Sequence, residues 1–283
     1  DLHALTYEAA IWDMKRVQSR LNNIIQSAML DEQDKEKAME ELQAKQSKAI
    51  QLVKNKVVDN LIERTEERIE RQLHFVKERL YIRFHGMFQE HFNPTTITEN
   101  GRQAHQQLAS NRNRLIDYVG YELLQEVRAV SIRLESYINN LFKDHYEQIS
   151  DELLSIDDII TLANYEEQRF TTPDYKQAFD SIDMNIFQDA LKTFRNLRAF
   201  FEQNEREQMK DVFYELLQPE VDSYLETEQK LMTTSYKEQL SLLFDQLMEN
   251  IHHEVSMIMT QQINILNTNI DSSDYKNTLD QIT

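Results

Sequence analysis

The sequence predicts an all-α fold, an elongated antiparallel helical bundle with long, coiled-coil-like helices. The chain of 283 residues has only 3 Gly and 3 Pro, too few for the many turns of a β-rich fold. Apolar residues recur in alternating steps of three and four over long stretches, the spacing of helices that pack on partner helices. Charged residues make up 28% and hydrophobic residues 40% of the chain, a balance that suits narrow apolar seams.

The first part of the chain is expected to form a neck-like helix over residues 1–30, followed by a long helical hairpin over residues 31–154. The first rising helix of that hairpin is expected to continue without a break from about Asp34 to Phe88, and some 50 residues of straight helix would extend about 75 Å. The neck seam comprises Ala10, Met14, Val17, Leu21, Ile24 and Ala28. The seam of the rising helix comprises Leu42, Ala49, Val53, Val57, Leu61, Ile69, Leu73, Val76, Leu80 and Phe84.

The first firm break comes at Pro94, because proline cannot continue a helix and disfavours a helical conformation in the residue before it. A tip loop is therefore expected near 84–101, followed by a descending helix that ends near Leu154. Gly120 inside that helix suggests a close contact with another helix. The seam of the descending helix comprises Leu108, Leu115, Val119, Leu123, Val127, Val130, Leu134, Ile138 and Leu141.

The last third of the chain is expected to contain an irregular connection and a second helical hairpin. Residues 155–183 form the connection, and residues 184–283 form the hairpin. Within that hairpin, a helix from about Met184 to Leu217 is expected to give way to a new helix at Pro219, which suits a first helical turn. Short turns between these elements would place neighbouring helices antiparallel.

Charge and composition exclude several classes of function. The formal net charge is -18 and the pI is about 4.9, so the surface should repel phosphate backbones, and no nucleic-acid partner is expected. Without cysteine, neither disulfides nor thiolate metal sites can form. No apolar run approaches the roughly 20 residues that span a bilayer, which also disfavours a helical pore-forming toxin. The chain begins at Asp1 without Met, a start that either a fragment cut from a longer protein or cleavage of a signal peptide would leave.

Motifs that carry chemistry are missing from the sequence. The three glycines stand apart, so neither a phosphate-binding loop nor a dinucleotide fingerprint is present. Glu249 and His252 form one Glu-x-x-His step, whereas carboxylate-bridged metal bundles use two such steps. His85 and His91 do not share a helical face. We therefore expect no catalytic residue, no metal site and no cofactor in this chain.

One cluster of apolar residues stands out beside the Pro94 break. It permits two interpretations, a hydrophobic cap that closes the end of the bundle or an exposed tip for a membrane or a partner protein. The candidate tip residues are Phe84, Met87, Phe88, Phe92 and Ile97. The irregular connection is a weaker candidate for the same role, through Ile159, Ile160, Leu162 and Phe170.

Three helical segments resemble bacterial dynamin-like proteins. Residues 194–209 read FRNLRAFFEQNEREQM and residues 121–135 read YELLQEVRAVSIRLE, and both look like parts of the helical region of that family. Residues 7–17, YEAAIWDMKRV, are similar to a helix that follows a GTPase domain. The resemblance covers most of the chain and implies the neck and trunk of such a protein, with its nucleotide-binding head missing.

The resemblance implies a function in self-assembly and in membrane remodelling, tethering or fusion. It places GTP and magnesium only in the missing head, which would be a partner in cis, and it implies self-association and lipid contact through a tip loop. A location in the cytoplasm, peripheral to the inner face of the membrane, follows from the same comparison. The alternative is a non-enzymatic coiled-coil scaffold or tether without lipid contact.

Overall fold

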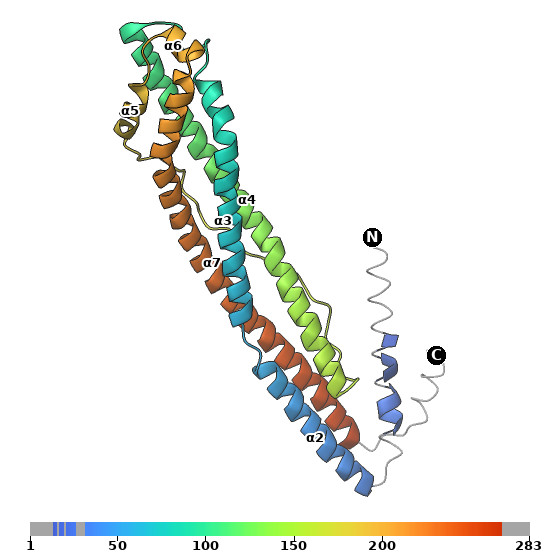
Figure 1. Ribbon diagram of the computed structural model, residues 1–283. Coiled ribbons are helices and arrows are strands. Elements are labelled where there is room, and N and C mark those ends of the chain that lie inside the picture. The colour runs from blue at the N-terminus through green and yellow to red at the C-terminus, as the bar shows by residue number, and fades with distance from the viewer. Residues whose placement is uncertain (1–13, 16, 20, 27–31, 268–283) are drawn as a thin grey trace. The chain divides into compact units, whose positions relative to one another are not determined.

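The computed structural model describes residues 14–15, 17–19, 21–26 and 32–267. The described residues form helices and connecting segments and contain no β-strand, which confirms the all-α class and the long helices. The helices are α2 (Glu32–Lys54), α3 (Asp59–His91), α4 (Gly101–Ile156), the 3₁₀ helix η1 (Met184–Phe187), α5 (Gln188–Leu191), α6 (Leu197–Glu202) and α7 (Glu205–Asn267) (Figure 1).

The chain divides into two compact units, each assembled from separate parts of the sequence. Unit 1 takes its residues from the ranges Asp1–Asp59, Asn139–Gln168 and Leu240–Thr283. Unit 2 comprises Asn60–Ile138 and Arg169–Gln239. The two longest helices, α4 and α7, therefore contribute residues to both units.

Unit 2 is a bundle of three long helical segments from α3, α4 and α7 (Figure 1). The helix α3 runs antiparallel to α4, since Arg79 pairs with Glu126 at 2.7 Å and Arg83 pairs with Glu122 at 2.6 Å. It also runs antiparallel to α7, whereas α4 and α7 run in the same direction. The antiparallel order expected for neighbouring helices is therefore wrong for this pair. Parallel helices need a long return connection.

That return connection is a non-helical segment of unit 2, residues 169–183, which contains a turn at residues 178–181 and which we call the strap. The side-chain amide of Gln239 on α7 holds it like a neighbouring β-strand. The amide oxygen accepts from the Thr171 backbone N–H at 2.7 Å, and the amide nitrogen donates to the Thr171 carbonyl at 2.9 Å. Farther along, Tyr175 hydrogen-bonds Ser131 of α4, and the Tyr224 hydroxyl donates to the Lys176 carbonyl at 3.0 Å. These side chains satisfy backbone N–H and C=O groups of the strap, which has no neighbouring β-strand to bond them.

Unit 1 has its own apolar core, to which α2 and the ends of α4 and α7 contribute. Two ion pairs of 2.8 Å hold this core together. Lys45 of α2 pairs with Asp157, just after α4, and Lys56, just after α2, pairs with Glu152 of α4. The core residues are Leu42, Ala49, Val53, Tyr146, Ile149, Leu153, Ile160, Leu162, Ile251, Val255, Met259 and Leu266. An extended segment also covers this unit, because the Tyr146 hydroxyl donates to the Ala163 carbonyl at 2.6 Å.

The expected seams are buried with few exceptions. All nine residues of the descending seam are buried in α4, and the rising seam is buried except at Val57, which is 61% exposed. The single helix expected from Asp34 to Phe88 is wrong at this point, because α2 ends at Lys54 and α3 starts at Asp59. The break falls at Asn55 and a pair of β-branched valines, residues that are weak helix formers.

In the neck seam, Leu21 is buried, Ile24 is half-buried, and Met14 and Val17 are exposed. The other two seam residues, Ala10 and Ala28, lie outside the described residues. The packing expected for this helix is therefore wrong at its two exposed positions.

The helix restart expected at Pro219 is also wrong. The described part of the 184–283 region contains no hairpin turn there, because α7 continues through Pro219 as one helix of 63 residues. A proline inside a helix removes one backbone hydrogen bond, and the packing of a long buried face compensates for that loss.

The interruption comes earlier than Pro219, within the helix expected over residues 184–217. Asn196 caps α6 by accepting from the Ala199 N–H at 2.9 Å. Asn204, with a φ angle of 69°, separates α6 from α7. Asparagine tolerates this left-handed conformation better than most residues, so it ends α6 where a glycine would otherwise be favoured.

Candidate interaction surfaces

The five candidate tip residues are buried inside unit 2. Phe84 is 2% exposed and Met87 is 5% exposed, while Phe88, Phe92 and Ile97 are at most 1% exposed. The exposed tip expected from these side chains is therefore not formed. They occupy the other arrangement that the sequence allows, in which apolar residues close one end of the bundle.

Aromatic packing explains this burial. The rings of Phe88 and Phe92 stack with centroids 4.4 Å apart, and Phe213 of α7 contacts both at 5.7 and 5.6 Å. Phe187 of η1 also stacks on Phe213, with ring centroids 5.2 Å apart. Each buried aromatic side chain removes 150–250 Å² from water. The last turn of α3 is thus closed by residues about 100 positions later in the chain, which local sequence patterns do not reveal.

The weaker candidate loop is divided between the two units. Ile160 and Leu162 are buried in the core of unit 1, and Ile159 is half-buried. Phe170 belongs to unit 2, is half-buried and lies 6.1 Å from the Tyr236 ring, measured between centroids. These residues are not brought together as one exposed apolar surface.

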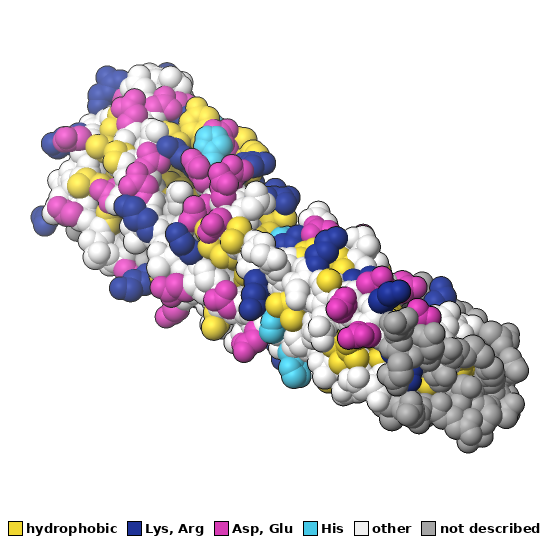
Figure 2. Space-filling view, turned by 90° about the horizontal axis from the view of Figure 1, so that it is seen from below, with side chains coloured by type: hydrophobic (Ala, Val, Ile, Leu, Met, Phe, Trp, Pro, Cys, Tyr) yellow, Lys and Arg dark blue, Asp and Glu magenta, His cyan; other side chains and the backbone are white. Residues whose placement is uncertain are grey.

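A surface that the sequence analysis missed lies on the outer face of α3. Arg71, Phe75, Arg79 and Ile82 recur at steps of three and four and share one face of the helix. We call these four residues the α3 ridge. Phe75 is 47% and Ile82 is 73% exposed, and the Arg71 and Arg79 side chains are 58% and 42% exposed. Among the surface side chains in Figure 2, hydrophobic patches likewise lie between acidic and basic groups.

Beside the ridge, α3 and α7 form an aromatic groove of about 430 Å³. Tyr81 is 62% exposed and packs edge to face on Tyr214 with centroids 5.0 Å apart. Phe84 lines the floor of the same groove. At one edge, Lys210 pairs with Glu207 at 2.8 Å, which holds the pKa of the Glu207 carboxyl below its ordinary value through a hydrogen bond. One candidate tip residue thus reaches a surface groove, although it is itself buried.

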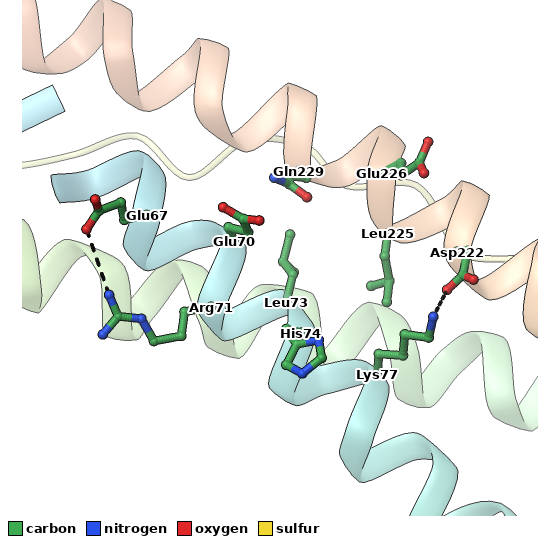
Figure 3. A pocket seen from close by; sticks show the side chains of 10 residues that line it. All are labelled: Glu67, Glu70, Arg71, Leu73, His74, Lys77, Asp222, Leu225, Glu226 and Gln229. Atoms are coloured by element: carbon green, nitrogen blue, oxygen red, sulfur yellow. Dashed lines mark ion pairs between the residues drawn. The ribbon is translucent and has the colours of Figure 1, made fainter. Parts of the chain in front are cut away.

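A second groove between α3 and α7, of about 800 Å³, is mostly polar. Figure 3 shows Leu73 and Leu225 between the two helices, with charged side chains around them. Lys77 of α3 reaches across to Asp222 of α7 at 2.6 Å, whereas Arg71 stays with Glu67 on its own helix at 3.9 Å. Ion pairs this exposed each contribute at most about 1 kcal/mol to the stability of the fold. The groove is therefore a solvent-exposed polar surface.

The histidines do not assemble a metal centre in the described part of the chain. No group of three His, Cys, Asp or Glu side chains is arranged there to hold an ion. His85 Nδ1 lies 3.6 Å from the Glu207 carboxylate, and His91 Nδ1 hydrogen-bonds the Met87 carbonyl at 2.8 Å. The two rings thus have separate partners, as their spacing in the sequence indicates. Among the described helices, none is long and apolar enough to cross a membrane.

The arrangement offers contact surfaces, namely the α3 ridge, the aromatic groove and the polar groove. No family model, curated protein or solved structure matches the chain.

Proposed function

We propose that this chain is the helical stalk module of a dynamin-like GTPase, in which it mediates self-assembly and membrane remodelling, tethering or fusion. Nucleotide chemistry with GTP and magnesium would then belong to a head domain in cis. The support from sequence is the resemblance of its helical segments to the neck and trunk of bacterial dynamin-like proteins. A stalk of this kind works by contact and by movement of its helices.

The observation that carries the proposal is the α3 ridge. Exposed apolar side chains next to arginines suit a surface that is acidic and partly apolar, such as anionic lipid or an acidic helix of another chain. Arginine and aromatic residues are also the types enriched at protein interfaces. In a chain with a net charge of -18, the local charge at the ridge is balanced, because Arg71 pairs with Glu67 and Arg79 pairs with Glu126.

A scaffold or tether without lipid contact is the second candidate function. It is favoured by the burial of the five candidate tip residues, from Phe84 to Ile97, because a buried aromatic cluster cannot insert into a bilayer as it stands. The acidic net charge favours it as well, since it opposes approach to anionic headgroups. In this case the α3 ridge would contact protein alone.

Vesicle flotation separates the two candidates. The purified chain is mixed with phosphatidylcholine vesicles, with and without phosphatidylserine, and compared with Ile82→Asp on the ridge. Ile132→Asp on α4 is the matched control, because Ile132 is 66% exposed and lies outside the ridge. If the chain is a stalk with lipid contact, the native chain and the Ile132→Asp control should float with the vesicles, and Ile82→Asp should not. If the native chain fails to float, the function with lipid contact is wrong and the scaffold remains.

A further inference from the structure

A pocket of about 310 Å³ lies between the strap and α7 in unit 2. The strap lines it with Lys176, Phe179 and Asp180, and α7 lines it with Glu220, Tyr224 and Glu228. All of these residues belong to the same compact unit. The pocket is separate from the α3 ridge and from both grooves between α3 and α7.

Glu228 is the unusual residue of this pocket. It is 3% exposed, and its Oε2 atom is buried without a hydrogen-bond partner. A buried carboxylate oxygen without a donor costs free energy, so native proteins rarely keep one without a reason. Lys176 lines the same pocket and its charge lowers the pKa of the Glu228 carboxyl, but it does not supply the hydrogen bond that Oε2 lacks. The Oε2 atom therefore keeps an unused capacity to accept a hydrogen bond, at a residue that lines the pocket.

Two aromatic rings line the same pocket. The Phe179 and Tyr224 rings lie with centroids 6.4 Å apart and planes tilted by 53°. Phe179 has a φ angle of 68°, a left-handed backbone conformation that is costly for a bulky residue. Such strain persists only where the surrounding structure holds it in place. Here the strained residue lies in the wall of the pocket.

We propose that this pocket binds an alkylammonium group, carried either by a free polyamine or by a lysine side chain of a partner protein. The ammonium would donate to Glu228 and lie against the faces of Phe179 and Tyr224. Charge-assisted hydrogen bonds and cation–π contacts favour this combination. Asp180 and Glu220 add negative charge around the pocket, while Lys176 opposes the incoming cation. Together, these residues would favour a positively charged amine over a neutral or negatively charged ligand.

Isothermal titration calorimetry with the full chain tests the proposal. The probes are spermidine and Nα-acetyl-lysine methylamide, in about 0.15 M salt so that diffuse attraction to the acidic chain is screened. The lysine probe acetylated on its Nε atom is the uncharged control. We expect one saturable site per chain for at least one charged probe and none for the uncharged control. Binding of spermidine alone identifies the free polyamine as the source, and binding of the lysine probe identifies a protein lysine.

The variants locate the site. Glu228→Gln keeps the shape of the side chain and removes its charge, and we expect it to weaken binding about tenfold or more. Glu226→Gln is the matched control, because Glu226 lies on the same helix but lines the polar groove, and we expect it to bind normally. Phe179→Leu, which removes the ring but keeps an apolar side chain, is expected to weaken binding several-fold. Absence of saturable binding, or equal affinity in Glu228→Gln and Glu226→Gln, would overturn the proposal.

Discussion

Two glycines in the helices of unit 2 have opposite surroundings. A Cβ atom added at Gly120 would lie 2.4 Å from the Ala178 carbonyl oxygen of the strap, whereas one added at Gly86 would meet no heavy atom within 4 Å. The close helix contact expected at Gly120 is thus a contact with the strap. It allows the strap backbone, at a turn over residues 178–181, to lie directly on α4.

We expect Gly120→Ala and Gly86→Ala to change stability in opposite directions. Gly120→Ala should lower the free energy of unfolding by about 1–3 kcal/mol, because the strap must move away from the new methyl group. Gly86→Ala should raise it by about 0.5–1 kcal/mol, since alanine favours a helix where space is available. Urea denaturation followed by circular dichroism measures both. Equal effects of the two substitutions would contradict the close approach of the strap at Ala178.

Burial of Glu228 also makes stability depend on pH. Burial raises the pKa of its carboxyl above the ordinary value, and Lys176 opposes that shift. The folded chain therefore holds this proton more strongly than the unfolded chain does. The stabilisation that this bound proton provides is complete at pH values below the pKa of Glu228 in the unfolded chain. It is lost as the pH rises through the pKa of Glu228 in the folded chain.

Glu228→Gln should remove this dependence because glutamine cannot ionise. At about pH 8 the variant should be more stable than the native chain, because it buries a neutral amide where the native chain buries an ionised carboxylate. The advantage should shrink as the pH falls toward the ordinary carboxyl pKa of about 4.3. Denaturation curves across this range measure the difference. A difference that stays constant with pH would show that ionisation of Glu228 is not its cause.

At the scale of the elements, the strap depends on side chains that imitate a neighbouring strand. Gln239 both accepts from and donates to the Thr171 backbone. Gln239→Glu keeps the acceptor but places a carboxylate oxygen against the Thr171 carbonyl, so we expect a loss of about 1–3 kcal/mol. Gln246→Glu on the exposed face of the same helix is the control and should change little. Equal stability of the two variants would mean that the strap is held by other contacts.

The helices were predictable from sequence to the extent that their apolar spacing was regular. The seam of α4 is buried as expected, and the break at Pro94 occurs where expected, with Asn93 Oδ1 accepting from the Thr95 N–H at 2.8 Å in the turn. The continuation of α7 through Pro219 was not predictable from local rules, because packing overrides the cost of the proline.

The path of the strap was beyond prediction for a different reason. Its contacts join residues far apart in the chain, such as Thr171 with Gln239 or Tyr175 with Ser131, and no periodic pattern encodes them. The burial of the candidate tip depends in the same way on Phe213. The α3 ridge was accessible from sequence, since Phe75 and Ile82 lie seven residues apart and off the seam that buries Leu73, Val76 and Leu80.

At the scale of the whole molecule, acidity and the α3 ridge act against each other. A net charge of -18 keeps copies apart at low ionic strength, and salt screens that repulsion over about 10 Å at 0.1 M. Apolar contact through Phe75 and Ile82 does not weaken with salt in the same way. We therefore expect self-association of the native chain to increase as the salt concentration rises.

Sedimentation velocity over a range of protein concentrations is the most direct test of the claim that this chain acts through the α3 ridge. We expect the native chain to sediment faster as its concentration rises, a Phe75→Asp, Ile82→Asp double variant to stay monomeric, and Ile132→Asp to behave like the native chain. Circular dichroism confirms that each variant keeps its helices. A native chain that remains monomeric at all concentrations, or a double variant that associates as the native chain does, would contradict that claim.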